Sequence, residues 1–170
     1  MADETLNGAG GAASSSATAQ LTIQKLYIKD ASFEAPGAPQ VFGDQGQPQL
    51  QLNLSQKVTN VAENVYEVVL TITVTCTIND KNAYLAEVQQ AGLFGLSGFE
   101  PRGLEAVLST YCPNTLFPYA RQTVSELVQN GGFPPLFLQP INFDQLYADQ
   151  VRRRASQAPA EGSDALAGNA

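Results

Sequence analysis

Residues 65–91 read VYEVVLTITVTCTINDKNAYLAEVQQA, and this stretch decides the fold. Between positions 65 and 78, apolar residues occupy every second position, while Glu67 and four threonines dominate the positions between them. This period of two is typical of a β-strand with one buried face. Residues 79–82 are rich in turn formers, and residues 83–91 resume the strand pattern. The stretch therefore predicts an antiparallel β-hairpin.

Two further strand patterns precede the hairpin. Residues 21–28 carry leucine, isoleucine and tyrosine in a strand-like run. A long connection follows over residues 29–48, which hold three prolines and three glycines. Leu50, Leu52 and Leu54 then alternate with polar residues, so we expect a second strand with one apolar face.

Beyond residue 100, the apolar residues recur every three or four positions, which indicates helices. A first helix has apolar residues at 104, 107, 108 and 111 and is broken by Pro113. A second has Pro118 in its first turn and ends at Gly131. A third begins at Asn142, because Gln145 three residues later completes a capping box. Strands followed by helices predict an α+β fold with an antiparallel sheet covered on one side.

The length of 170 residues fits one ordinary domain, which we place at residues 21–150. Residues 1–20 lack the basic and apolar regions of a secretory signal and predict a disordered leader on a cytoplasmic protein. Residues 151–170, which include the cluster Arg152-Arg153-Arg154, predict a flexible tail. No apolar run reaches the roughly 18 residues of a membrane span, so we expect no insertion into a bilayer.

The composition excludes several classes of function. The net charge of -7 argues against a nucleic-acid partner, which requires a clustered basic surface. The chain has no histidine and two cysteines, which excludes histidine-dependent triads and dyads and the common zinc sites. Cys76 and Cys112 are expected to be reduced thiols. Residues 92–98, GLFGLSG, lack the Gly-Lys-Ser/Thr of a phosphate loop and are interpreted as a flexible connector from strand to helix.

Two apolar segments have two interpretations at this stage, residues 133–138 (FPPLFL) and residues 93–96 (LFGL). Both segments fit buried loops of the core. Together with the leucines of the second strand, they also fit a hydrophobic surface that receives extended peptides. Carboxylates such as Asp30, Glu34, Glu87 and Glu100 are by default solvated surface residues, although an acid and base pair among them stays open.

Five blocks of the chain resemble the SecB family of export chaperones, in the same order and with the same spacing. They are KDASFEAP at 29–36, VYEVVLTITVT at 65–75, EVQQAGLF at 87–94, YCPNTLFPYAR at 111–121 and PINFDQLY at 140–147. The resemblance spans residues 22–148. It implies a four-stranded antiparallel sheet with helices on one side, assembled as a dimer of dimers. It also implies a cytoplasmic chaperone without cofactor or catalytic activity, which holds unfolded preproteins and delivers them to the ATPase SecA.

The resemblance implies three sets of site residues. The surface that contacts SecA is acidic, lies on the sheet and corresponds here to Asp30, Glu34, Leu85 and Glu87. The groove for preproteins corresponds to Phe33, Phe42, Leu50, Leu52, Leu54 and Phe94. The interface of the homotetramer corresponds to Ala86, Val88 and Gln90. Gly46 stands where many members carry an aromatic residue, which implies a wider or weaker aromatic end of the groove.

Two other functions stay open. A hydrolase or isomerase would need two carboxyl groups that converge in an apolar cleft with shifted pKa values. A SecB-like chaperone specialised for a client outside secretion, such as an antitoxin, would share the fold. Because the acidic SecA-contacting positions are intact, export is the function we expect.

Overall fold

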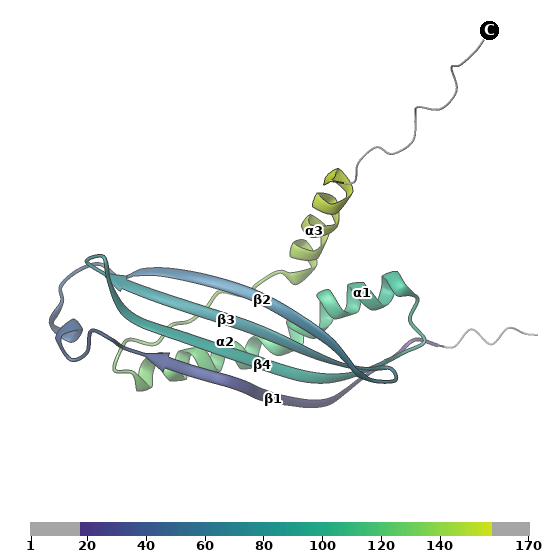
Figure 1. Ribbon diagram of the computed structural model, residues 1–170, viewed down its shortest axis with the longest axis horizontal. Helices are drawn as coiled ribbons and strands as arrows, with labels where there is room; N and C mark the ends of the chain where they lie inside the picture. The colour runs from purple at the N-terminus through teal and green to yellow at the C-terminus, as the bar shows by residue number, and fades with distance from the viewer. Residues whose placement is uncertain (1–17, 158–170) are drawn as a thin grey trace, which may run out of the picture.

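Four long strands form one antiparallel sheet in the spatial order β1-β4-β3-β2 (Figure 1). The strands are β1 (Gln20–Glu34), β2 (Gln49–Ala62), β3 (Val65–Ile78) and β4 (Lys81–Ser97). The computed structural model describes residues 18–157, so most of the expected leader and the end of the expected tail lie outside the described residues. The four-stranded antiparallel sheet and the α+β class are confirmed.

The hairpin of β3 and β4 follows the sequence pattern. β3 has the predicted bounds, and a two-residue loop, Asn79 and Asp80, joins it to β4. Both loop residues have positive φ angles, of 50° and 61°. This backbone matches the twist of the two strands, and Asn and Asp adopt it more readily than other residues with side chains.

β1 is longer than predicted and continues to Glu34. Its pairing with β4 shifts in register between Ile23 and Lys25 and again between Ile28 and Asp30. Each shift places one extra residue in β1, so the alternation of apolar and polar residues is interrupted. The interruptions explain why a search for a period of two ends the strand too early.

β4 also exceeds its predicted length, because the expected flexible connector is strand up to Ser97. Its glycines allow close packing. A Cβ added at Gly92 would lie 2.7 Å from the ring of Phe94, and one added at Gly95 would lie 2.5 Å from Oγ1 of Thr22. Glycine in a strand often marks such an approach by other groups. The interpretation of this segment as a flexible loop is therefore wrong.

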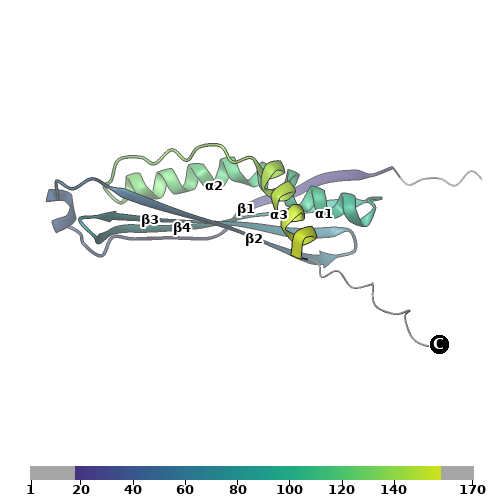
Figure 2. The same cartoon turned by 90° about the horizontal axis from the view of Figure 1, so that it is seen from above.

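Three helices follow the sheet, α1 (Pro101–Ser109), α2 (Tyr111–Asn130) and α3 (Phe143–Gln157). α2 lies along β4 and β3 and leaves β2 uncovered. Figure 2 shows α2 and the chain that follows it on one side of the sheet. The core fills the space between α2 and the two central strands, and its largest fully buried side chains include Leu70, Ile72, Val88, Phe94 and Leu116.

The prolines near α2 differ from the prediction. Thr110 separates α1 from α2, so Pro113 lies in the first turn of α2 and Pro118 lies inside the helix. A proline in the first turn lacks only an N–H that has no partner within the helix. An interior proline is costly, and here the burial of its neighbours Leu116 and Phe117 against the sheet offsets that cost.

α3 begins at the predicted cap, where the backbone N–H of Gln145 donates to Oδ1 of Asn142 at 3.0 Å. The helix continues to Gln157, into the segment expected to be a flexible tail. An ion pair of 2.6 Å between Arg154 and Glu105 links this end of α3 to α1. Because Arg154 and Glu105 lie far apart in the chain, the sequence alone does not reveal this contact.

Cys76 and Cys112 are both buried and free. Burial raises the pKa of both thiols, that of Cys112 to about 12. Such thiols are protonated at neutral pH and therefore poor nucleophiles.

Candidate functional site

The two faces of the sheet carry different side chains. The inner face is the one that α2 covers, and the outer face is the opposite one. Asn53 on β2 pairs with Thr73 on β3, and both are polar outer-face positions. Leu52 and Leu54, on either side of Asn53, face inward because side chains alternate along a strand.

The four residues expected to contact SecA lie together on the outer face. Glu34 pairs with Leu85 across β1 and β4, and Glu87 and Asp30 follow in the next rows. Asp30 and Glu34 are exposed, and the other two side chains are half-buried. Oγ1 of Thr73 donates to a carboxylate oxygen of Glu87 at 2.9 Å. We call these four residues the acidic patch, and within residues 18–157 none of its carboxylates has an ion-pair partner.

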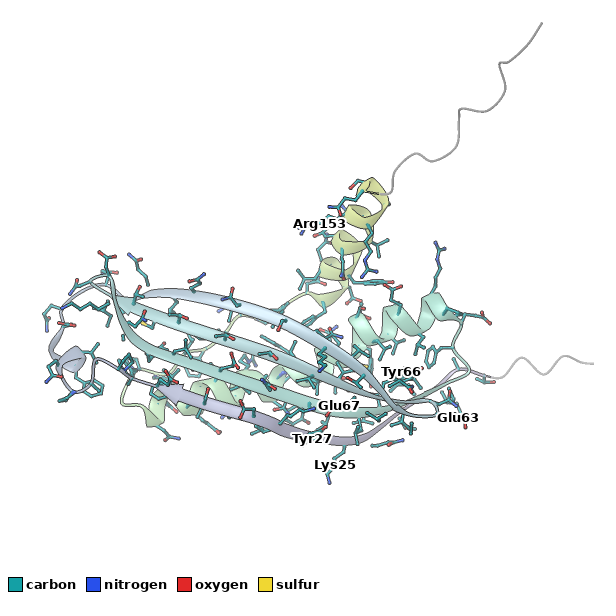
Figure 3. All side chains as sticks on the ribbon, in the orientation of Figure 1. Lys25, Tyr27, Glu63, Tyr66, Glu67 and Arg153 are labelled. Atoms are coloured by element: carbon teal, nitrogen blue, oxygen red, sulfur yellow. The ribbon has the colours of Figure 1, made fainter. Side chains whose placement is uncertain are left out.

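A second charged group lies farther along the outer face, where Glu67 pairs with Leu93, six positions along β4 from Glu87. Glu67 of β3 accepts hydrogen bonds from Nζ of Lys29 through both carboxylate oxygens, each at 2.8 Å, and from the hydroxyl of Tyr27. The bond from Lys29 and the bond from Tyr27 hold the pKa of Glu67 below its ordinary value. The bond to Glu67 and burial raise the pKa of Tyr27 to about 12. We call this group the Glu67 cluster (Figure 3).

Sequence reasoning missed the Glu67 cluster, although two signals were present. Tyr27 and Lys29 are two positions apart, as on one face of a strand, and Glu67 is the single charged residue of β3. What the sequence does not reveal is that β4 lies between β1 and β3. The contact crosses that central strand.

On the inner face, four aromatic rings gather near the hairpin end of the sheet. The ring of Phe133 lies 4.8 Å from that of Tyr84 and 5.2 Å from that of Phe42, measured between centroids. Phe33 stacks on Tyr84 at 5.8 Å. Phe137 in the same segment as Phe133 is 72% exposed. Phe133, Leu136 and Leu138 are partly buried against the core, so residues 133–138 combine core packing with one accessible apolar side chain.

A cavity of about 230 Å³ lies beside these rings, between the start of β2 and the segment after α2. Its lining is apolar and consists of Pro48, Leu50, Cys76, Ile78, Tyr84, Phe133, Pro134, Pro135 and Leu136. The volume suits one large apolar side chain of a ligand. Leu50 itself is 52% exposed.

A second cavity, of about 390 Å³, lies farther along the inner face of β2. Leu54 and Val58 of β2 form one wall, and α3 forms another with Leu146 and Tyr147. Leu52, 44% exposed, lies on the same face between the two cavities. We call the two cavities and the leucines of β2 the β2 groove. Leu50, Leu52 and Leu54 thus share the inner face, and Leu50 lies nearest the rings that include Phe33 and Phe42. Their role in binding preproteins stays a prediction.

Phe94 does not belong to the β2 groove, which corrects the expectation for this residue. Its side chain has no exposed area and belongs to the core. β4 is two strands away from β2, and its inner face is covered by α2. The expectation rested on the family resemblance, and the structure shows that the residue is a buried, inward-facing position of a central strand.

Ala86, Val88 and Gln90 also differ from the expectation of an interface. Ala86 and Val88 have no exposed area, and Gln90 is 3% exposed. Alternation along β4 turns these side chains toward α2. Nε2 of Gln90 donates to the backbone oxygen of Tyr27 at 3.0 Å. Within the single chain these residues belong to the core, and their role in a subunit interface stays a prediction.

Residues 18–157 contain no group of three or more His, Cys, Asp or Glu that could hold a metal ion. In the same range, no helix is long and apolar enough to cross a membrane. The cavities of the β2 groove have no carboxyl group in their linings. Within the described residues, the β2 groove and the acidic patch therefore lie on opposite faces of one sheet.

Residues 14–154 match the model of the family described as preprotein translocase subunit SecB. The protein-export protein SecB of Xanthomonas euvesicatoria pv. vesicatoria is 54% identical over 170 residues, which cover 100% of both chains. That of Xanthomonas campestris pv. campestris is 55% identical with the same coverage. That of Stenotrophomonas maltophilia is 51% identical over 172 residues and 100% of both chains.

A solved structure also resembles the fold. It is a SecB-like chaperone of Mycobacterium tuberculosis in complex with a peptide from an antitoxin. The TM-score is 0.61 at 19% identity, and the alignment covers 72% of this chain and 91% of that chain. At this identity the likeness shows the fold alone.

Proposed function

The chain belongs to the SecB family, and we propose that it is an export chaperone that holds unfolded preproteins in the cytoplasm and delivers them to SecA. Relatives at more than half identity over the full length are named protein-export protein SecB, which supports a role in preprotein export. In this proposal, preproteins bind the β2 groove and SecA binds the acidic patch. The chain itself catalyses no reaction.

The observation that carries the proposal is the separation of the two surfaces. The β2 groove lies on the inner face and combines an apolar cavity at the start of β2 with a larger cavity of mixed lining, which includes Gln56, Gln150 and Arg154. The acidic patch lies on the outer face. A carrier that must hold a client while a second protein recognises it requires two surfaces that do not overlap. An enzyme would instead bring reactive groups together in one pocket, and the groove cavities have no carboxyl groups in their linings.

The β2 groove suits extended apolar segments of low sequence specificity. Leu50 and Leu52 are about half exposed, so a client can still bury much of their apolar area. Full burial of one leucine side chain contributes roughly 1.5 to 3 kcal/mol, and partial burial contributes less. Several such contacts along one client raise the effective concentration at the next site, so weak contacts combine into stable holding without folding.

The acidic patch suits a basic region of SecA. None of its three carboxylates forms an ion pair within the described residues. Complementary charge across an interface raises the rate of encounter and fixes its orientation. The polar outer face around the patch offers few apolar contacts, so an unfolded client would gain little by binding there.

We further propose that the chain assembles as a dimer of dimers. Both β1 and β2 are edge strands with one unpaired side. On β1, Ile23 and Ile28 are 42% and 52% exposed. An unpaired edge with apolar side chains is a template for pairing with a second chain, and closed symmetric assembly is the usual way to cover it.

Size-exclusion chromatography with light scattering tests the proposal on the full chain. Four chains per particle are expected, and an unfolded preprotein and SecA should add to the same particle together. A strictly monomeric species at micromolar concentration would contradict the assembly. Displacement of the preprotein by SecA would contradict two separate surfaces. A particle that binds an antitoxin but neither partner would favour the specialised chaperone instead.

A further inference from the structure

We propose that Glu67 is a positioning residue for the acidic patch. It holds the ammonium group of Lys29 and so prevents this cation from neutralising Asp30, the carboxylate of the patch that follows Lys29 in the chain. This inference rests on the proposed function of the patch as the surface that binds a basic region of SecA. It assigns a role in partner recognition to a residue that is not itself in the patch.

A bulge in β1 places Lys29 next to the patch. Ile28 pairs with Gln90 and Asp30 pairs with Gln89, so Lys29 is the extra residue of the register shift. In a regular strand, Lys29 and Asp30 would point to opposite faces of the sheet. With the extra residue, both side chains lie on the outer face, because Lys29 bonds Glu67 there. The fold thus brings a cation to the edge of the acidic patch.

Glu67 binds this cation with more than one contact. Nζ of Lys29 lies 2.8 Å from each carboxylate oxygen, and the hydroxyl of Tyr27 donates to one of them. The side chain of Glu67 is 13% exposed and that of Lys29 is 45% exposed. Partial shielding from water and two hydrogen bonds hold the ammonium more firmly than a fully exposed pair would. Figure 3 shows Tyr27 and Glu67 beside one another on the sheet.

If Lys29 were released from Glu67, its positive charge would reduce the net negative charge of the acidic patch. Lysine carries a point charge on a flexible stem of four carbons. Asp30 is the next residue in the chain, so the free ammonium would lie near the carboxylate of Asp30, within the Debye length of about 8 Å at physiological ionic strength. At such a separation, salt does not fully screen the attraction between the two charges. The patch has three carboxylates and no ion pair of its own among the described residues. One free cation beside Asp30 would therefore offset one of its three negative charges.

Titration calorimetry of the full chain against purified SecA tests the inference. Glu67→Gln should weaken binding by about twofold to fivefold, the range that one exposed charge contributes. Glu63→Gln is the matched control, because Glu63 lies in the turn between β2 and β3 and forms no ion pair among the described residues. This control should leave the affinity within about twofold of the wild type. Affinity for an unfolded client should be unchanged in both variants.

A double-mutant cycle distinguishes the effect of releasing Lys29 from the effect of removing the negative charge of Glu67. In a Lys29→Met background, Glu67→Gln should have little further effect on SecA affinity, because no cation is left to release. An equal loss in both backgrounds would overturn the inference. If Glu67→Gln melts below the assay temperature, the exchanged pair Lys29→Glu with Glu67→Lys carries the test. It should bind as the wild type does, and weakened binding by this folded variant would overturn the inference.

The outcomes also distinguish this inference from the proposed function. A wild-type chain that does not bind SecA would overturn both. Wild-type binding that Glu67→Gln leaves unchanged would overturn the inference alone. Binding that Glu34→Lys with Glu87→Lys abolishes, while Glu67→Gln is silent, would keep the patch as the SecA surface and remove Glu67 from its support.

Discussion

Phe33 rests on Gly131, the residue where α2 ends, and this contact fixes one side of the aromatic cluster. A Cβ added at Gly131 would overlap the ring of Phe33. Phe33 in turn stacks on Tyr84 and lies 6.3 Å from Phe133 between ring centroids. The position of the Phe33 ring therefore depends on the absence of a side chain at Gly131.

Gly131→Ala should displace the ring of Phe33 and destabilise the fold by about 1 to 3 kcal/mol, the usual cost of overpacking. It should also weaken binding of an unfolded client, since the first cavity adjoins the displaced rings. Gly43→Ala is the matched control, because an added Cβ there meets no atom within 4 Å. Chemical denaturation and client titration measure the two effects, and equal stability of both variants would contradict the packing argument.

The ion pair of Glu67 predicts a pH-dependent contribution to stability. Its pKa in the folded chain is lowered from the ordinary 4.5, chiefly by the hydrogen bond from Lys29. A carboxyl group whose pKa is lower in the folded chain than in the unfolded chain stabilises the fold at pH values above its pKa in the unfolded chain. This contribution is lost as the pH falls through its pKa in the folded chain. The wild type should therefore exceed Glu67→Gln by up to about 1 kcal/mol at pH 7. The difference should shrink below about pH 4.5 in urea unfolding at several pH values, and a constant difference would contradict the linkage.

Single residues were predictable where local chemistry decides their role. The Asn79-Asp80 turn and the Asn142 cap need only their immediate neighbours, and both were found. Phe94 and Ala86 could not be placed in the same way. Their burial depends on α2, which crosses β4 only in the folded chain.

At the scale of elements, β2 has two different faces and one uncovered side. Its inner face carries the leucines of the groove, and its outer face carries polar residues opposite the threonines of β3. α2 covers the neighbouring strands and not β2. The leucines of β2 therefore remain accessible, although they lie on the inner face of the sheet, where the neighbouring strands carry core residues.

Leu50→Ser with Leu52→Ser should weaken binding of an unfolded client without unfolding the chain. The two side chains are 52% and 44% exposed, so only part of their apolar area supports the fold. The free energy of client binding should become less favourable by at most about 1.5 to 3 kcal/mol per leucine. Gln51→Ser with Asn53→Ser, on the outer face of the same strand, should leave client binding unchanged. Early melting of the leucine variant in circular dichroism would show that these leucines are core residues.

Elements with an unbroken pattern were predictable, and those with irregular backbone were not. β3 has strict alternation and its bounds were found. β1 carries two bulges, and β4 carries glycines where a helix or a neighbouring strand approaches, so both strands were predicted too short. In each case, contacts from elsewhere in the fold override the local signal.

The sheet of the whole molecule separates the β2 groove from the acidic patch. Under the proposed function, a client bound on the inner face would leave the acidic patch free, so one chain could engage client and SecA at once. The order of strands makes this possible, because the patch lies on β1 and β4 while the groove follows β2 at the opposite edge. The assignment of residues to the patch depended on the family resemblance, since strand pairing cannot be read from composition or spacing alone.

Charge reversal of the acidic patch tests this separation. Glu34→Lys with Glu87→Lys adds repulsion toward a basic region of SecA and should lower its affinity by more than tenfold. Asp30→Asn alone should lower it by no more than about fivefold, since one exposed charge contributes about 0.2 to 1 kcal/mol. Glu63→Lys with Glu100→Lys makes the same change in net charge at the other end of the sheet and should have a smaller effect. Salt should weaken the wild-type complex. Calorimetry against SecA and against an unfolded client decides the matter: unchanged SecA affinity would exclude this face, and loss of both affinities would mean that the variant is unfolded.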